Sequence, residues 1–235
     1  KNDLFDYPNR YIMQIKDGFK FSLDSLLLAE FTKLRQSDKL ILDMCTGNAP
    51  VPLVLSLKTD AKIIGFELQR AIAELAWESI SINGLDKQIK VINDDVKNIG
   101  EFFKPNTFDV ITCNPPYFKI NDDKNINKND YLTLARHEIA IDLETIFKLV
   151  NRFLKDNGVF YMVHRAERLD EIIILANKYK LNVKEIQFIS TKKNNNPSTI
   201  LVKCVKNSKI GVKIKREICV DNLSTYQHLF EGSGK

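Results

Sequence analysis

The sequence predicts an α/β fold: a seven-stranded, mostly parallel sheet with an antiparallel last strand and helices on both faces. Two observations lead to this prediction. Short apolar, β-branched runs alternate with helical periodicity between residues 39 and 189. Each of the first four runs also ends in a polar residue, and the carboxyl ends of parallel strands meet at one edge of a sheet. We therefore expect a ligand site at that edge.

The first part of the chain is predicted to be an arm followed by a helix. In residues 1–21, aromatic residues are interleaved with Lys and Arg without clean periodicity, which indicates an irregular arm. From Ser22, a residue type that caps helices, apolar residues recur on one helical face. Residues 39–43 then form the first strand, and a turn containing Gly47 leads into a helix at 51–58.

The remaining elements continue this alternation. Further strands are expected at 62–66, 89–92, 108–111, 159–163, 183–189 and 199–205, and further helices at 70–83, 143–154 and 167–179. The connection at 191–198 is too short for a crossover helix, so the last strand is expected to run antiparallel. Residues 211–220 are expected to extend the sheet edge. We interpret the chain as one domain, 1–235, with an arm and helix at 1–38, a core at 39–206, and an extension and tail at 207–235.

Composition restricts the class of protein. The 235 residues are 44% hydrophobic, enough for one large domain with a substantial core. No secretory signal pattern or bilayer-spanning apolar run is present, which indicates a soluble cytoplasmic protein without a membrane partner. Four scattered cysteines without a C-x-x-C pair suggest neither a disulfide framework nor a metal site. The net charge of +5 favours a polyanionic partner only if the cations cluster, and the sequence does not determine the oligomeric state.

The stretch 112–118 is the most distinctive of the strand ends. The β-branched run before it gives way to Asn114, and two prolines then fix the backbone and remove two donors. Because a residue before proline is held extended, the carbonyl oxygens of this turn have no ladder partner. The side-chain oxygen of Asn114 and the carbonyl of Pro115, beside the flat ring of Tyr117, form an acceptor cluster that suits a planar group carrying an NH2.

The acids at the other strand ends match the needs of an S-adenosylmethionine enzyme. Asp43 and the Gly47 turn can approach the methionine end, where backbone N–H groups would meet its carboxylate. Glu67 is placed to accept hydrogen bonds from ribose hydroxyls, and Asp95 from the adenine amine. A single acid of this kind is more often a helix cap, so the prediction depends on three in register together with Asn114. The turn lacks G-x-G-x-x-G, which disfavours a phosphate site.

Five blocks of residues carry a family resemblance. They are Asn114-Pro115-Pro116-Tyr117, Asp43-x-Cys45-Thr46-Gly47-Asn48, Phe21-Ser22-Leu23-Asp24, Ala135-Arg136-His137-Glu138 and Val163-His164-Arg165. Together they resemble the bacterial tRNA (adenine-N6)-methyltransferases that modify the adenine beside the anticodon of a valine tRNA. The first block alone is shared with glutamine-directed and guanine-directed methyltransferases, whereas the combination is much more specific. The resemblance implies a Rossmann-like class I methyltransferase fold, S-adenosyl-L-methionine as cofactor and the anticodon stem-loop of a tRNA as partner.

The motifs and the resemblance together predict three groups of site residues. Catalysis is assigned to Asn114, Pro115, Pro116 and Tyr117. Cofactor binding is assigned to Phe21, Ser22, Asp24, Asp43, Thr46, Gly47, Asn48, Glu67, Leu68, Asp94, Asp95 and Asn114. Substrate binding is assigned to Phe118, Lys119, Lys124, Lys128, Arg136, His137 and Arg165. No metal ligand is predicted, and both His137 and His164 are interpreted as surface or loop residues rather than as bases.

The implied reaction is transfer of a sulfonium methyl group to the exocyclic nitrogen of an adenine. Asn114 and the Pro115 carbonyl would hold that nitrogen by accepting hydrogen bonds from its two N–H groups. One alternative is a protein glutamine-N5 methyltransferase or another RNA or DNA amino-group methyltransferase. A second is a cofactor-binding or RNA-binding protein without catalysis, because Ala49 stands where the family usually carries glycine. A Cβ there is expected to leave less room for the cofactor and to lower its affinity or shift the loop.

Overall fold

A central sheet of nine strands organises the structure, a computed structural model that describes residues 2–4, 7, 9–14, 23–116, 141–191 and 194–220. In chain order the strands are β3 (Leu40–Asp43), β4 (Lys62–Phe66), β5 (Ile89–Ile92), β6 (Phe108–Cys113), β7 (Leu154–Arg165), β8 (Leu181–Thr191), β9 (Asn194–Lys206), β10 (Lys213–Ile214) and β11 (Ile218–Cys219). Across the sheet the order is β5-β4-β3-β6-β7-β9-β8, with β10 and β11 both paired to β8.

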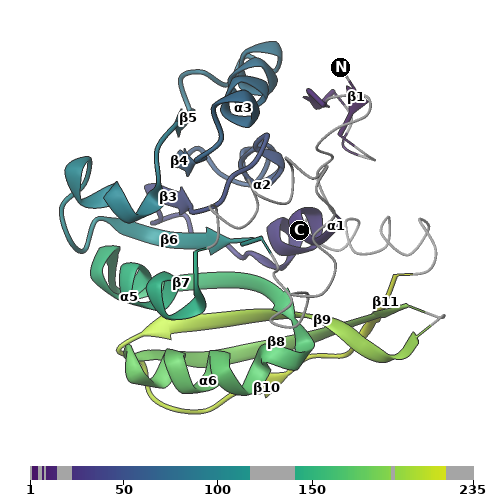
Figure 1. Cartoon of the computed structure of the whole chain (residues 1–235), viewed down its shortest axis with the longest axis vertical. Helices are drawn as coiled ribbons and strands as arrows, with labels where there is room; N and C mark the ends of the chain where they lie inside the picture. The colour runs from purple at the N-terminus through teal and green to yellow at the C-terminus, as the bar shows by residue number, and fades with distance from the viewer. Residues whose placement is uncertain are drawn as a thin grey trace, which may run out of the picture.

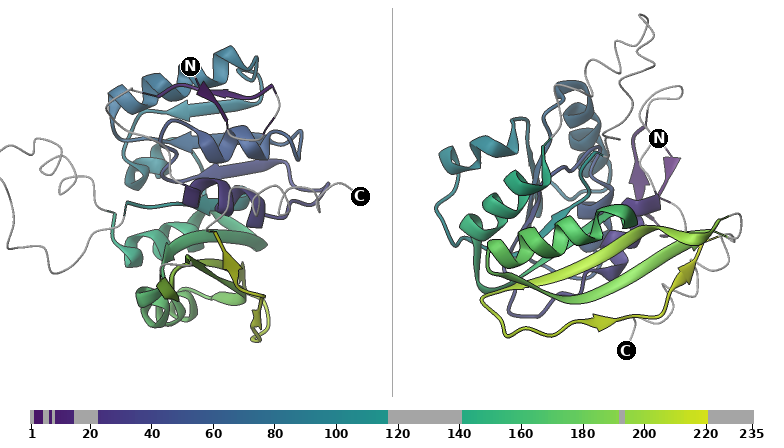
Figure 2. Two further views of the ribbon diagram at one scale, coloured as in Figure 1. Left: turned by 90° about the vertical axis from the view of Figure 1, so that its right-hand side faces the viewer. Right: turned by 60° about the horizontal axis from the view of Figure 1, so that its bottom comes forward.

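Strand direction agrees with the prediction. Strand β9 runs antiparallel to both of its neighbours, β7 and β8, while the other described pairs in this sheet are parallel. The predicted edge extension at 211–220 is present as β10 and β11. Figure 2 shows the long β8–β9 pair reaching beyond the other strands. The parallel strands β3 to β7 therefore place their carboxyl ends along one edge.

Helices cover both faces of the sheet, as predicted (Figure 1). One face carries α1 (Leu23–Phe31), α2 (Pro50–Leu55) and α3 (Arg70–Ile82), and the other carries α5 (Leu143–Phe153), α6 (Leu169–Lys178) and the 3-10 turns η1 (Val96–Glu101) and η2 (Ala166–Arg168). Successive strand residues point to opposite faces, so Ile41 and Val110 join one core while Leu42 and Ile111 join the other. No helix in the described ranges is long and apolar enough to cross a bilayer.

The N-terminal arm differs from the prediction of irregular structure over residues 1–21. In its described part, β1 (Asn2–Asp3) pairs antiparallel with β2 (Tyr11–Ile12). Two backbone N–H groups of the arm donate to the side chains of Asn83 and Ser79, at 3.0 and 2.9 Å. Asn83 and Ser79 lie more than sixty residues further along the chain, so the local sequence pattern of the arm gave no sign of these two contacts.

The later strands are longer than predicted. Strand β7 begins at Leu154, before its expected start at Val159. Leu154 pairs with Phe108 of β6, and the next paired residue of β7 is Val159, so the register shifts between them. The residues between Leu154 and Val159 form a local excursion around Asn157, whose φ is +59°, and the strand continues after it. Similarly, β9 begins at Asn194 and takes up most of the loop expected at 191–198.

Candidate active site

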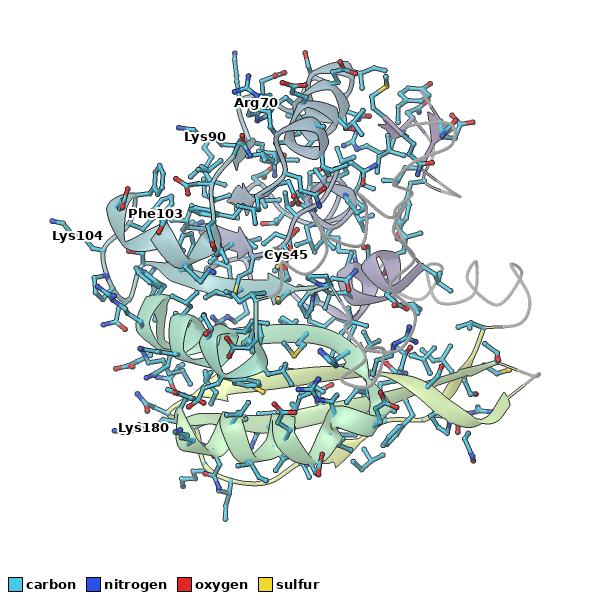
Figure 3. All side chains as sticks on the ribbon, viewed as in Figure 1. Cys45, Arg70, Lys90, Phe103, Lys104 and Lys180 are labelled. Carbon is cyan, nitrogen blue, oxygen red and sulfur yellow. The ribbon has the colours of Figure 1, made fainter. Side chains whose placement is uncertain are left out.

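A cavity of about 380 Å³ opens where β3, β4, β5 and β6 end. The predicted residues that line it are Asp24, Thr46, Gly47, Asn48, Glu67, Leu68, Asp94, Asp95, Asn114, Pro115, Pro116 and Arg165. Figure 3 shows Cys45, another lining residue, near the middle of the molecule, whereas the labelled Lys90, Lys104 and Lys180 point outwards at its periphery. The expected ligand edge is therefore a hollow built from several separate segments of the chain.

The loop between β3 and α2 forms one wall of this cavity. Gly47 has φ +56°, a left-handed conformation that glycine adopts without a Cβ penalty. The preceding N–H, of Thr46, donates to the carbonyl of Phe66 at 2.9 Å. This crossing is so close that a Cβ on Gly65 would lie 2.8 Å from Thr46 Oγ1. A glycine in β4 thus allows the loop to pass over the end of the strand.

Asp43 supports this loop from below. It is 1% exposed and is not among the lining residues. Its carboxylate accepts hydrogen bonds from the hydroxyls of Thr46 and Thr112, both at 2.7 Å. Burial raises the pKa of Asp43 to about 6, although the two hydroxyl donors act in the opposite direction. Asp43 therefore connects β3, β6 and the loop, whereas direct contact with the methionine end of a cofactor was predicted for it.

Glu67, at the end of β4, faces the cavity as predicted. One carboxylate oxygen accepts the N–H of Gly47 at 3.0 Å, and the other accepts the N–H of Gln69 at 2.8 Å. Burial raises the pKa of Glu67, while these two backbone donors lower it. A carboxylate oxygen has more than one lone pair, so each can also accept a hydroxyl from a ligand.

The acids after β5 have structural partners as well as a place in the cavity wall. Asp95 caps η1 by accepting the N–H of Lys97 at 2.9 Å, and its second oxygen forms an ion pair with the Lys97 ammonium. Asp94 accepts from the N–H of Asp95 and from the amide of Asn98. The helix-cap interpretation is therefore correct for Asp95, and its exposure to the cavity leaves it available to a ligand as well.

Asn114 follows β6 directly and lines the cavity with Pro115 and Pro116. Its side-chain Nδ2 donates to Oγ of Ser25 on α1, at 2.9 Å. The amide of Asn114 is thus held from the side of α1 while the two prolines restrict the backbone that follows it.

Asn48 supplies a further acceptor in this cavity. It is fully buried, and its Nδ2 donates to the carbonyl of Met13 at 2.8 Å. Its Oδ1 is also buried and accepts no hydrogen bond from the described residues. Because an unpaired buried acceptor is costly, this atom indicates a place where a ligand donor belongs.

Two residues lie elsewhere than expected. His164 is 5% exposed within β7, so its interpretation as a surface or loop residue was wrong. Burial, together with the nearby Arg168 charge, lowers the pKa of His164 to about 4, and the ring is neutral at pH 7. Ala49 has φ +71°, is completely buried in the core between sheet and helices, and does not line the cavity. Its methyl group therefore strains the backbone by about 1 kcal/mol and does not fill cofactor space.

Several predicted residues fall outside the described part of the chain. They are Phe21, Ser22, Tyr117, Phe118, Lys119, Lys124, Lys128, Arg136 and His137. Conversely, the sequence reasoning did not assign a site role to eight lining residues, Ser25, Met44, Cys45, Pro50, Phe66, Gln69, Val96 and Ile141. Most of these are neighbours of residues that were assigned, so sequence adjacency was the available signal.

Comparisons with known proteins agree with this geometry. The family model described as a methyltransferase domain matches residues 35–218. A tRNA1(Val) (adenine(37)-N6)-methyltransferase of Bacteroides thetaiotaomicron is 27% identical over 215 residues, covering 90% of this chain and 87% of that protein. The resemblance inferred from the motifs is thereby confirmed.

Solved structures support the fold. A predicted O-methyltransferase of Agrobacterium tumefaciens has a TM-score of 0.68 at 17% identity, covering 89% of this chain and 96% of that chain. A class I S-adenosylmethionine-dependent methyltransferase of Listeria monocytogenes has a TM-score of 0.59 at 13% identity, covering 88% and 67%. At these identities the likeness concerns the architecture alone.

Proposed function

This chain belongs to the methyltransferase domain family, and from that premise we propose that it methylates the exocyclic N6 of an adenine in tRNA, at position 37 of a valine tRNA. The observation that carries the proposal is the place of Asn114. It stands at the end of β6, followed by two prolines, on the same cavity as Gly47 and Glu67. The name of the Bacteroides relative supports adenine 37 as the target.

The cavity fits S-adenosylmethionine. Glu67 offers carboxylate oxygens to ribose hydroxyls, Asp94 and Asp95 stand at the neighbouring strand end, and Asn48 presents a buried acceptor that the described protein groups leave unpaired. When bound, the cofactor supplies a methyl group whose bond to sulfur breaks as its bond to the acceptor nitrogen forms. Glu67 and the loop then hold and orient this donor, which is how an enzyme reduces the entropic barrier of a two-substrate reaction.

Asn114 prepares the acceptor nitrogen. The lone pair of an adenine amine is delocalised into the ring, so the amine is a weak nucleophile. When the Asn114 oxygen and the Pro115 carbonyl accept hydrogen bonds from its two N–H groups, electron density on nitrogen rises and the lone pair is aimed into the cavity. Since an amide is hardly basic, Asn114 positions the amine, and the proton released after transfer passes to water.

Two predicted contacts complete the proposal. Tyr117 would stack on the flipped base, and an anticodon-loop adenine is cheap to unstack. Arg165, at the end of β7 and on the cavity wall, is suited to a substrate phosphate. Lys119, Lys124, Lys128 and Arg136 keep the same predicted role.

The decisive test uses purified protein, labelled S-adenosylmethionine and an unmodified valine tRNA transcript. We expect label in N6-methyladenosine at position 37 and none in a transcript with guanine there. Asn114→Ala is expected to abolish transfer while leaving cofactor affinity within about twofold, because the loop and Glu67 are untouched. Label in a glutamine-containing peptide but not in tRNA would instead identify a protein methyltransferase. RNA binding without label would identify a non-catalytic protein.

A further inference from the structure

The side-chain amide of Asn114 has two orientations, related by a half-turn. Only one of them presents its oxygen to a substrate amine, while the other presents a donor that would repel it. The prolines that follow restrict the backbone, but the terminal torsion of an Asn side chain has no strong preference of its own. A neighbouring group that accepts from the amide nitrogen therefore favours the productive orientation.

The structure places Ser25 in that position. Its Oγ accepts from Asn114 Nδ2 at 2.9 Å, so the amide nitrogen is turned towards α1. Ser25 is 6% exposed and lines the same cavity. Helix α1 packs against α2 and β7, so the hydroxyl is carried by a rigid part of the core.

We propose that Ser25 is a positioning residue for methyl transfer: by holding the Asn114 amide nitrogen, it presents the Asn114 oxygen to the acceptor amine. This inference rests on the proposed function for its substrate. Its chemistry, however, applies to any planar acceptor NH2. Loss of the hydroxyl removes this contact to the amide nitrogen, makes the productive orientation less favoured, and weakens an interaction that matters most in the transition state.

The experiment compares Ser25→Ala with Ser25→Thr, which keeps the hydroxyl. For Ser25→Ala we expect kcat on tRNA to fall about tenfold, the equivalent of one hydrogen bond. The dissociation constant of S-adenosylmethionine and the melting temperature should stay near wild type. Ser25→Thr should recover most of the lost kcat.

The matched control is Thr32→Val. Thr32 is a buried hydroxyl residue immediately after α1, and its Oγ1 donates to the carbonyl of Leu28, four residues earlier, at 2.8 Å. It should leave kcat unchanged. The inference is overturned by a wild-type kcat in Ser25→Ala, by an equal kcat loss in Thr32→Val, or by a loss that follows cofactor affinity.

The failure of the proposed function has a different signature. If wild-type protein labels a glutamine peptide and not tRNA, the substrate assignment fails, and the same variants are measured on the peptide with the same expected ratio. A wild-type protein that labels neither acceptor overturns both proposals.

Discussion

Gly65→Ala tests whether the shape of the cofactor loop depends on the absence of one methyl group. A Cβ at this position would lie 2.8 Å from Oγ1, 2.9 Å from Cβ and 2.9 Å from Cγ2 of Thr46. Thr46 cannot rotate away, because its Cβ is attached to backbone whose N–H is bonded to Phe66, and its hydroxyl is bonded to Asp43. The loop itself must therefore move.

The magnitude follows from these contacts. Overpacking of this kind typically costs 1–3 kcal/mol of stability. A displaced loop also weakens the hydrogen bond from the Gly47 N–H to Glu67, and a bond to a charged group contributes about 1.5 kcal/mol or more. If the loop must return to its wild-type position to bind S-adenosylmethionine, the dissociation constant rises about tenfold.

Isothermal titration with the cofactor and urea unfolding measure the two effects separately. Gly100→Ala is the matched control, because its added Cβ would meet nothing nearer than 3.7 Å and should change neither quantity appreciably. Wild-type affinity in Gly65→Ala would refute the reasoning that the close crossing of β4 and the loop shapes the site.

Two further predictions concern buried groups. The pKa of Asp43 is raised to about 6, so the folded state holds this proton more tightly and the stability that it contributes is lost as pH rises through 6. The pKa of His164 is lowered to about 4, so the folded state resists protonation and stability is lost as pH falls from 6.5 to 4. Each effect amounts to about 3 kcal/mol at most, and the two oppose each other in the wild type. His164→Gln removes the His164 effect, so the variant should be more stable at pH 4.5 than at pH 6.5 in urea titrations. A pH dependence of the unfolding free energy equal to that of the wild type would contradict this. Ala49→Gly should leave the cofactor dissociation constant within about twofold, because the methyl group lies in the core; a large gain in affinity would show that it obstructs the site.

The parts of the fold that the sequence predicted correctly are those with local signals. Strand β4 was predicted at 62–66 and observed at the same residues, because an apolar run bounded by polar residues contains the whole signal. The polar residue at each strand end reached the same edge for a topological reason, since parallel strands share their direction. The direction of β9 was equally predictable, from a connection too short to cross the sheet.

The contacts that organise the site are not local, and this is where prediction stopped. Asn114 and Ser25 are 89 residues apart, and the hydroxyl of Thr112 reaches Asp43 across 69. Asp43 was predicted at the correct edge of the sheet. Its side chain, however, is buried against the β3–α2 loop because the hydroxyls of Thr46 and Thr112 donate to its carboxylate. The direction of a strand-end side chain depends on partners from other strands, so an acid can be predicted at the edge of a sheet without its role as ligand or support being decided. Ala49 is a second example of a direction that the sequence could not predict. Its methyl group was expected to leave less room for the cofactor, whereas the fold places it in the core.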